Sequence, residues 1–425
     1  MPKQSNIVAS RSTAEQFTLK TFCHGTHRVV SPVETVSRLR CLYGPVGITR
    51  VANVTGLDCI GIPVVMVCRP NGRSLAVSQG KGVDLDAARA SGLMEAIELF
   101  HAERITHALK LASWNELRFS HEVISVGDLP KVSISAFHPN RSLLWIQGGD
   151  LFTSAAVWLP YELVHMNYTL PFPTGSGSFV MSSNGLASGN HVLEAISHGL
   201  CEVIERDATT LFRFESAKAQ ADARIELSTV ADPDCRRLLE QYESAGVIAG
   251  VWDVTSDVGI PAYRCVILER DPCPLRRVGP AEGMGCHPVR EVALLRALTE
   301  AAQARLTLVA GSRDDNGRGR YSEFGSRQLL ERARERLAEH GTRRFDATPS
   351  YVNHTLEQDV GLILERLRAV GLSQAVVVDL TKPEFGIPVV RVVVPGLETY
   401  HHVQGYVPGE RALRLLKARA EEAQS

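Results

Sequence analysis

One pattern occurs three times along the chain and constrains its fold more than any other feature. Each time, a glycine-rich segment leads into a helix-forming stretch that carries polar side chains at positions i, i+4 and i+7. The three sets are Ser91, Glu95 and Glu98; His198, Glu202 and Glu205; and Arg296, Glu300 and Gln303. Residues at this spacing share one face of an α-helix. The recurrence therefore predicts one supersecondary unit used three times in degenerate form.

The glycines recur at matching distances from the glutamates. Gly80 precedes Glu95 by the same interval that separates Gly285 from Glu300. A glycine-rich turn before a helix presents backbone N–H groups and the positive end of the helix dipole, both of which favour phosphate. The chain has no GxxxxGK[ST] sequence and no kinase HRD or DFG motif, so a nucleotide site here would have to be of another kind.

Two of the helices carry glutamates three residues apart, Glu95 with Glu98 and Glu202 with Glu205, among apolar neighbours. Buried carboxylates are costly unless they are paired or bound to a metal. Oxygen ligands favour Mg²⁺ or Ca²⁺ over zinc, and Mg²⁺ held by few carboxylates completes its shell with water and substrate phosphates. The pattern predicts a nucleoside triphosphate held through metal ions.

A simpler interpretation competes with this one. A single E-x-x-E pair is most often a solvated helix face, and Glu205, Arg206 and Asp207 alone are typical of a surface charge cluster. Three copies in the same glycine-rich context favour a function. Arg206 and Arg305 can then neutralise phosphate oxygens or pair with the glutamates.

Periodicity and composition indicate an α+β fold with mixed β-sheets and packed helices. The predicted strands lie at 60–67, 263–268, 375–379 and 391–394. The predicted helices lie near 86–107, 191–215, 288–310, 326–340, 356–370 and 410–422. The predicted domains are a flexible N-terminal arm at 1–17, a catalytic domain at 18–405 with subdomains near 18–170, 171–280 and 281–405, and a C-terminal helix or tail at 406–425. The stretch 171–190 is predicted as a long loop.

The bulk composition narrows the class of protein. A formal net charge of −1 without a basic stripe argues against nucleic acid as a partner. The polar N-terminus and the lack of a long apolar run predict a cytoplasmic protein without a signal peptide or membrane span. The nine cysteines form no CxxC pair, which argues against a zinc knuckle and indicates reduced thiols.

Four segments together resemble the YcaO family and span most of the chain. They are SQGKGVDLDAARASGLMEAIE, SSNGLASGNHVLEAISHGLCEVIERDA, GMGCHPVREVALLRALTEAAQARL and GIPVVRVVVPGLE. The second, which ends in EVIERDA, is the most specific. The resemblance implies a YcaO-like fold in which the repeated units surround a non-P-loop ATP site that binds Mg²⁺.

The resemblance also implies roles for single residues. The implied roles are metal ligation by Glu95, Glu98, Glu202 and Glu205; catalysis by Glu202, Glu205 and Arg206; and nucleotide contacts by Arg28, Ser91, Asn190, Glu194, Arg206 and Gln303, with Lys20 as an alternative to Arg28. Two positions depart from the family pattern. Leu99 follows Glu98 where many members have arginine, and Ala187 stands where some have serine.

The implied reaction is ATP-dependent O-phosphorylation of a peptide backbone amide. The chain ends RLLKARAEEAQS, without the proline-rich tail common in azoline-forming members, and its N-terminal segments are similar to members that act beside a TfuA-like partner. We therefore expect thioamide formation on a peptide or protein with a sulfide donor, a TfuA-like partner and a homodimeric enzyme. The alternatives are an azoline-forming cyclodehydratase acting on Cys, Ser or Thr, and a non-catalytic nucleotide-binding scaffold.

Overall fold

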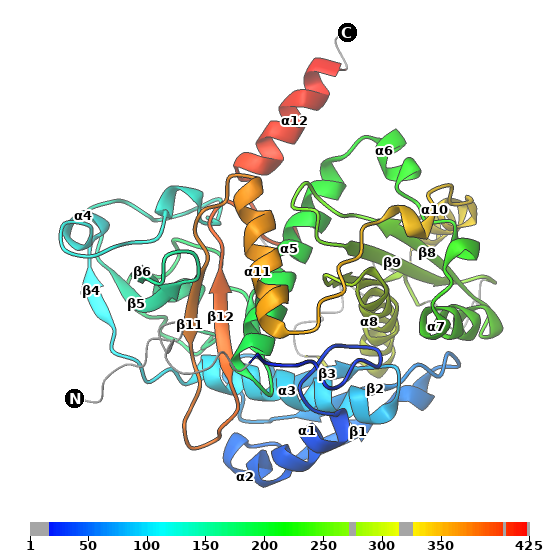
Figure 1. Ribbon diagram of the computed structural model, residues 1–425, viewed down its shortest axis with the longest axis horizontal. Helices are drawn as coiled ribbons and strands as arrows, with labels where there is room; N and C mark the ends of the chain where they lie inside the picture. Colours follow the sequence, from blue (N-terminus) through cyan, green and yellow to red (C-terminus); the bar gives the residue numbers. More distant parts are fainter. Residues whose placement is uncertain (1–16, 272–277, 314–325, 403–404, 423–425) are drawn as a thin grey trace. The chain divides into compact units, whose positions relative to one another are not determined.

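A computed structural model describes residues 17–271, 278–313, 326–402 and 405–422, so that nearly all of the predicted arm at 1–17 lies outside the described residues. The chain has an α+β fold, as predicted, and its strands pair antiparallel wherever they are described (Figure 1). It divides into two compact units, each made of separate stretches of the sequence. Unit 1 comprises Met1–Lys20, Glu98–Phe214 and Asn353–Ser425, and Unit 2 comprises Thr21–Ile97 and Glu215–Val352. The three consecutive subdomains stay a prediction.

Unit 1 is built on a six-stranded sheet in the order β4-β5-β11-β12-β7, with β6 paired to β5. The strands are β4 (Lys110–Ala112), β5 (Leu143–Asp150), β6 (Ala156–Pro160), β7 (Leu186–Ser188), β11 (Val376–Asp379) and β12 (Val389–Val393). The helices are α4 (Trp114–Leu117), α5 (Val192–Phe214), α11 (Leu356–Ala369) and α12 (Glu410–Glu422). Helix α5 packs on β12 and β7, and α11 and α12 pack on α5.

Helix α5 approaches the sheet closely because two glycines lie at the crossing. A Cβ atom on Gly199 of α5 would lie 2.6 Å from Cγ2 of Val392, and one on Gly185 would lie 2.2 Å from the carbonyl oxygen of Val392. Gly185 also has a φ of +77°, which side-chain-bearing residues rarely adopt. The two glycines let α5 lie directly against β12 and the residue before β7.

Unit 2 contains two three-stranded sheets, in the orders β1-β2-β3 and β10-β9-β8. The strands are β1 (Arg50–Asn53), β2 (Val64–Cys68), β3 (Val77–Lys81), β8 (Val247–Asp253), β9 (Ala262–Glu269) and β10 (Ala281–Cys286). The helices are α1 (Pro32–Leu39), α2 (Tyr43–Val46), α6 (Ala217–Asp222), α7 (Pro233–Ser244), α8 (Arg290–Ala310) and α10 (Arg327–Ala338). Helix α3 (Leu85–Glu103) begins in Unit 2 and continues into Unit 1.

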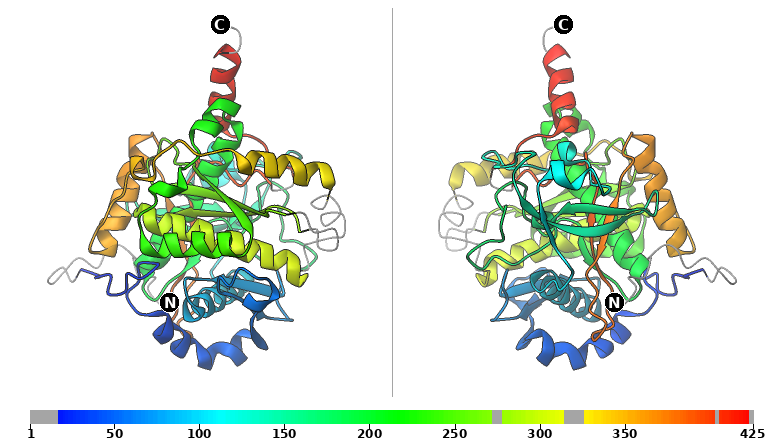
Figure 2. Two further views of the ribbon diagram at one scale, coloured as in Figure 1. Left: turned by 90° about the vertical axis from the view of Figure 1, so that its right-hand side faces the viewer. Right: turned by 90° about the vertical axis from the view of Figure 1, so that its left-hand side faces the viewer.

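Helices cover both faces of the β8–β10 sheet. Helices α7 and α8 pack on one face, and α10 lies on the other (Figures 1 and 2). Successive side chains of a strand point to opposite faces of the sheet. Val251 of β8 is buried in the core with α7 and α8, whereas a Cβ atom on the preceding Gly250 would meet Leu337 of α10.

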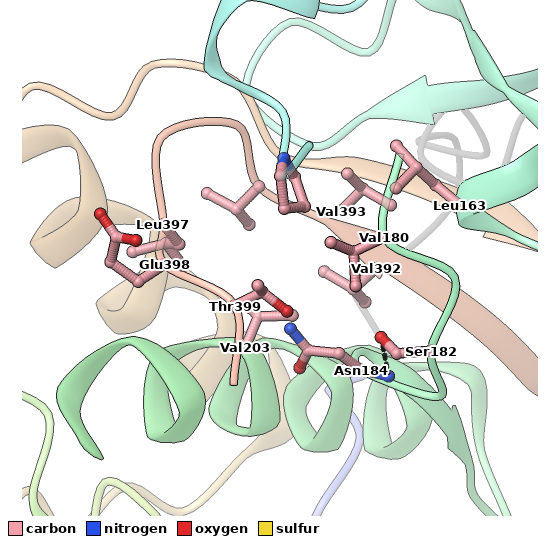
Figure 3. A pocket seen from close by; sticks show the side chains of 12 residues that line it. Leu163, Val180, Ser182, Asn184, Val203, Val392, Val393, Leu397, Glu398 and Thr399 are labelled. Atoms are coloured by element: carbon pink, nitrogen blue, oxygen red, sulfur yellow. Dashed lines mark hydrogen bonds between the residues drawn. The ribbon is translucent and has the colours of Figure 1, made fainter. Parts of the chain in front are cut away.

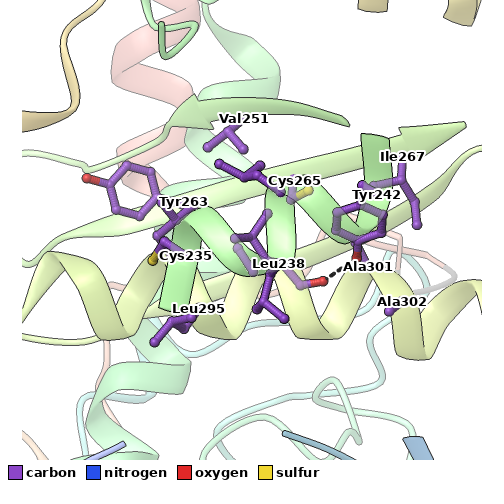
Figure 4. Packing of buried hydrophobic residues seen from close by; sticks show 14 of the residues in the cluster. Cys235, Leu238, Tyr242, Val251, Tyr263, Cys265, Ile267, Leu295, Ala301 and Ala302 are labelled. Atoms are coloured by element: carbon purple, nitrogen blue, oxygen red, sulfur yellow. Dashed lines mark hydrogen bonds between the residues drawn. The ribbon is translucent and has the colours of Figure 1, made fainter. Parts of the chain in front are cut away.

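The core of Unit 2 joins α7, α8 and this sheet (Figure 4). Tyr242 of α7 is fully buried in it, and its hydroxyl donates a hydrogen bond of 2.6 Å to the carbonyl oxygen of Leu298 in α8. Burial raises the pKa of Tyr242 well above its usual value, so the hydroxyl keeps its proton and remains a donor.

Replacing Tyr242 by phenylalanine is expected to lower the free energy of unfolding by about 1 kcal/mol, since the ring is kept and one buried hydrogen bond is lost. Urea denaturation measures the change. The same substitution at the half-buried Tyr43 is the control and is expected to shift stability by less than about 0.5 kcal/mol. Equal shifts for the two variants would contradict this role for the hydroxyl.

The threefold recurrence predicted from the sequence is present as three strand–helix units. Strand β3 leads into α3, β7 into α5 and β10 into α8. The predicted turns at Gly80 and Gly285 are wrong, since both glycines lie within strands, β3 and β10. A Cβ atom at Gly80 would lie 2.0 Å from the carbonyl oxygen of Ala88. These glycines therefore let each strand lie against the backbone of the helix that follows it.

None of the helices in the described ranges is both long enough and apolar enough to span a bilayer.

Candidate nucleotide and metal site

Glu95 and Glu98 lie one turn apart on the same side of α3, as their spacing predicts. In Unit 2, Oε2 of Glu95 accepts a hydrogen bond of 3.1 Å from the backbone N–H of Gln79 in β3. Burial raises the pKa of Glu95, and the Gln79 hydrogen bond and the charges of Arg313 and Lys81 only partly offset it. A bound cation would remove the cost of this buried charge, so Glu95 fits the predicted role of metal ligand.

The third polar set has a different character. Oε2 of Glu300 on α8 forms an ion pair with Nζ of Lys81, and Oε1 accepts the backbone N–H of Met284 at 3.4 Å. Glu300 is therefore neutralised within the protein. This pairing agrees with its absence from the predicted metal ligands.

Gln303, predicted to contact the nucleotide, lies beside Gln79 in Unit 2. Its Nε2 donates to Oε1 of Gln79 at 3.4 Å, and the hydroxyl of Thr307 donates to the same oxygen at 2.5 Å. In the part of the chain that the structure describes, Oε1 of Gln303 and Nε2 of Gln79 are buried without a hydrogen-bond partner. Such atoms normally have partners, and a bound ligand would supply them. Sequence reasoning missed Gln79, although the segment SQGKG contains it.

In Unit 1, Glu98 is held by Ser188 at the end of β7. Oε1 of Glu98 accepts the backbone N–H of Ser188 at 2.8 Å and its hydroxyl at 2.6 Å. These two bonds orient the carboxylate of Glu98. Ser188 is a second residue that the sequence reasoning did not select.

The three residues predicted to be catalytic come together on α5. Arg206 lies 3.8 Å from Oε1 of Glu202 and 3.5 Å from Oε1 of Glu205, and its guanidinium is 5.1 Å from the ring centre of Tyr400. Both separations exceed a normal charged hydrogen bond. One arginine thus faces two carboxylates and an aromatic ring, an arrangement that suits it to move between a carboxylate and a phosphate oxygen.

Arg391 of β12 is a functional candidate that the sequence reasoning missed. Its side chain is fully buried, and its guanidinium donates to three backbone carbonyls: to Val164 at 3.1 Å, Ser182 at 2.8 Å and Asn184 at 2.7 Å. A charged residue inside the run of β-branched residues at 389–394 was the available signal.

The charge of Arg391 acts on the carboxylates of Unit 1. Burial lowers the pKa of Arg391 to about 10, against the opposing effects of Glu202, Tyr168 and Glu98. At neutral pH the guanidinium remains charged. It therefore offsets the negative charge of two predicted metal ligands, Glu98 and Glu202, from within the protein core.

The other residues predicted to contact the nucleotide have partners within the protein. Oε2 of Glu194 accepts the backbone N–H of Asn190 at 2.7 Å where α5 begins, and Arg28 donates to the carbonyl oxygen of His27 at 3.0 Å. Lys20 forms a buried ion pair of 2.8 Å with Asp359 in Unit 1. Ser91 lies on α3, one turn before Glu95.

Arg305 corrects one expectation from the sequence. It was expected to meet phosphate oxygens or the glutamates of the repeated pattern. Instead it is buried in Unit 2, 2.7 Å from Oε1 of Glu269 and 3.4 Å from Oδ2 of Asp58. Its charge is balanced by two carboxylates outside the pattern, which gives it a structural role.

The four predicted metal ligands are distributed over both units, with Glu95 in Unit 2 and Glu98, Glu202 and Glu205 in Unit 1. Among the residues that the structure describes, no three His, Cys, Asp or Glu side chains are grouped so that they could hold a metal ion. The metal set stays a prediction, supported by the environments of Glu95 and Glu98.

His165 lies beside Arg391 and is fully buried, with its ring stacked on Tyr161. Its Nδ1 accepts the backbone N–H of Asn167 at 3.2 Å. Burial, together with the charge of Arg391, lowers the pKa of His165 to about 4. Between pH 6.5 and 4 the unfolded chain therefore binds a proton that the folded chain does not, and stability falls as the pH falls.

We expect His165 to make the protein about 2 kcal/mol less stable at pH 5 than at pH 8. The His165→Asn variant should lose this pH-dependent contribution. Its asparagine side chain still offers an acceptor for the backbone N–H of Asn167. Urea denaturation at the two pH values measures it. His138 is the matched control, because its Nδ1 also accepts a backbone N–H two residues later, from Asn140, but its side chain is exposed. A His165→Asn variant with the pH dependence of His138→Asn would contradict the assignment.

Comparison with known proteins defines the class of this chain. The family model described as a YcaO cyclodehydratase that binds ATP and Mg²⁺ matches residues 79–398. The chain belongs to the YcaO family, as the sequence motifs predicted.

Its relatives and structural neighbours are consistent with that family. The chain is 36% identical over 395 residues to an uncharacterised protein in the tfuA 3′ region of Rhizobium leguminosarum bv. trifolii, covering 92% of this chain and 93% of that protein. It is also 36% identical over 386 residues to an uncharacterised protein of Methanothermobacter thermautotrophicus, covering 88% of this chain and 95% of that protein.

Two solved structures share the fold. YcaO from Methanopyrus kandleri bound with AMPPCP and Mg²⁺ superimposes with a TM-score of 0.73 at 24% identity, over 92% of this chain and 99% of that one. A heterocyclase in complex with substrate and cofactor superimposes with a TM-score of 0.75 at 22% identity, over 97% of this chain and 57% of that one.

Proposed function

We propose that this protein is an ATP-dependent enzyme that modifies the backbone amide of a peptide or protein, and that it forms a thioamide from sulfide with a TfuA-like partner. The arrangement of Glu202, Glu205 and Arg206 on one face of α5 carries the proposal. Membership of a family described as binding ATP and Mg²⁺ supports the nucleotide, and the relative in a tfuA 3′ region supports the partner.

In this proposal, Glu95, Glu98, Glu202 and Glu205 hold Mg²⁺, which supplies positive charge at the phosphate oxygens of ATP. Gln303 and Arg28 contact the nucleotide, together with Ser91, Asn190 and Glu194. Arg206 leaves its carboxylates to meet the phosphate, because its two ion pairs are long. Its charge then opposes the negative charge that develops during phosphoryl transfer.

Hydrosulfide supplies the sulfur and ATP activates the oxygen in the proposed reaction. Hydrosulfide adds to the carbonyl carbon of the amide, and the former carbonyl oxygen takes the γ-phosphoryl group of ATP, which releases ADP. Loss of the C–O bond then releases phosphate, and loss of a proton leaves a C=S bond. An amide carbonyl is a poor electrophile, so much of the rate gain must come from positioning.

Azoline formation is the second candidate, because the matching family model is described as a cyclodehydratase. In that reaction a Cys, Ser or Thr side chain of the peptide replaces hydrosulfide. A nucleotide-binding scaffold is the third. The grouping of Glu202, Glu205 and Arg206 on α5 favours catalysis over a scaffold.

Intact-mass spectrometry separates these functions. The purified protein is incubated with Mg-ATP, sulfide and the peptide encoded beside its gene, with and without a neighbouring TfuA-like protein. A mass gain equal to the exchange of one oxygen for sulfur is the expected result. Loss of one water would show cyclodehydration, and an unchanged peptide without ATP turnover would favour the scaffold.

A further inference from the structure

Unit 1 contains a small pocket beside α5, with a volume of about 40 Å³ (Figure 3). Its polar wall residues are Ser182, Asn184, Glu398 and Thr399. The rest of the wall, which includes Leu163 and Val203, is made of proline and aliphatic side chains. By the same measure a water molecule needs about 10–15 Å³, so the pocket has room for about three atoms of water size.

The pocket adjoins the residues proposed to handle phosphate. Val203, in its wall, precedes Arg206 by one turn on the same side of α5. Thr399, also in the wall, precedes Tyr400, whose ring faces the guanidinium of Arg206. A group bound in the pocket would therefore lie on the part of α5 that carries the proposed chemistry.

Arg391 fixes the loop that forms one side of the pocket. Its guanidinium binds the carbonyl oxygens of Ser182 and Asn184, and both residues line the pocket. The backbone N–H of Asn184 donates to the hydroxyl of Ser182 at 3.3 Å. The loop is thus held at several points, which makes the pocket a preformed feature of this unit.

Asn184 gives the pocket a specific polar group. Its side-chain amide is turned toward Thr399 and Val203 (Figure 3), and its Oδ1 is buried without a hydrogen-bond partner in the described part of the chain. A carboxamide can accept one hydrogen bond and donate another. This pair of functions is complementary to the N–H and C=O groups of a peptide backbone.

Charge in the wall disfavours an anion as the occupant. Glu398 is the one charged residue in the wall, and Figure 3 shows its carboxylate turned away from the pocket. That carboxylate accepts hydrogen bonds from Tyr406, Gly409 and Ala412, so it is already satisfied. The remaining wall is neutral and largely apolar, which favours an uncharged aliphatic group.

We propose that this pocket binds one residue of the peptide substrate, with the three carbon atoms of a small aliphatic side chain, such as that of valine, among the apolar residues and the backbone amide at the edge of the pocket, paired with Asn184. The inference rests on the proposed function for the identity of the substrate as a peptide. The pocket accordingly selects a small residue next to the amide that reacts and rejects an aromatic one.

Blocked tripeptides of sequence Ac-Gly-Xaa-Gly-NH₂, with valine or phenylalanine at Xaa, test the pocket by saturation-transfer NMR on the full chain. We expect the valine peptide to bind at least about ten-fold more tightly, because apolar pockets discriminate by size to this degree.

The Leu163→Ala variant enlarges the pocket and is expected to gain about ten-fold in affinity for the phenylalanine peptide. The Asn184→Leu variant should weaken the binding of both peptides about ten-fold. Ile134→Ala, at a residue 87% exposed, is the control and should match the parent.

The gain by Leu163→Ala cannot arise from a folding defect. Equal binding of the two peptides by the parent, binding of neither, or an unchanged preference in Leu163→Ala would each overturn the inference. Mg-ATP hydrolysis is measured on the same samples. Hydrolysis without peptide discrimination contradicts the pocket alone, whereas discrimination without hydrolysis contradicts the proposed function and leaves the pocket assignment standing.

Discussion

Replacing Glu202 by glutamine is expected to lower ATP turnover by about 100- to 1,000-fold, because the side chain keeps its size but loses the charge proposed to bind Mg²⁺. The fold should survive the change. Glu202 is only half-buried, and its ion pair with Arg206 is long at 3.8 Å, so the free energy of unfolding should fall by less than about 1 kcal/mol. Phosphate release measures turnover, and urea denaturation measures stability.

The chain supplies a matched control for this variant in its third repeat. Glu300 occupies the position that corresponds to Glu202, but Lys81 neutralises it. The Glu300→Gln variant is therefore expected to retain turnover within about ten-fold of the parent. Full turnover in Glu202→Gln, or equal losses in the two variants, would show that α5 does not carry the metal-binding charge.

Replacing Arg391 by methionine is expected to lower the free energy of unfolding by about 3 kcal/mol or more. The change leaves the buried carbonyls of Val164, Ser182 and Asn184 without their donor and removes the charge that offsets nearby carboxylates. Lysine should recover only part of the loss, since a single ammonium cannot reproduce the planar arrangement of donors. Urea denaturation again gives the measurement.

Arg414→Met is the control for this substitution. Arg414 is exposed on α12 and pairs with Glu410 one turn away at 3.1 Å, so its replacement should cost less than about 0.5 kcal/mol. A similar small loss for Arg391→Met would mean that the buried guanidinium is not needed to hold the loop around Asn184.

Much of the fold was predictable because periodicity is a local property. The strand predicted at 263–268 is found at Ala262–Glu269, and the helix predicted at 191–215 is found at Val192–Phe214. The recurrence of carboxylates at helical spacing also identified the polar face of α5. In these cases the side chains that decide the structure lie within one element, where spacing alone reveals a shared face.

Long-range partners were not predictable in the same way. Nothing local distinguishes Arg305, which pairs with Asp58 and Glu269 in the core, from Arg206, which faces the glutamates of its own helix. Gly80 was placed in a turn because glycine is common there. Its actual role depends on the close approach of α3 to β3, which only the folded chain shows.

Calorimetric titration of the protein with AMPPCP, carried out once in the presence of Mg²⁺ and once in the presence of EDTA, tests the central claim most directly. If the glutamates hold the phosphates through Mg²⁺, AMPPCP binds when Mg²⁺ is present and its binding is lost in EDTA. A variant that combines Glu95→Gln with Glu202→Gln then binds AMPPCP more weakly. Equal affinity with and without Mg²⁺, unchanged by the two substitutions, would contradict the account.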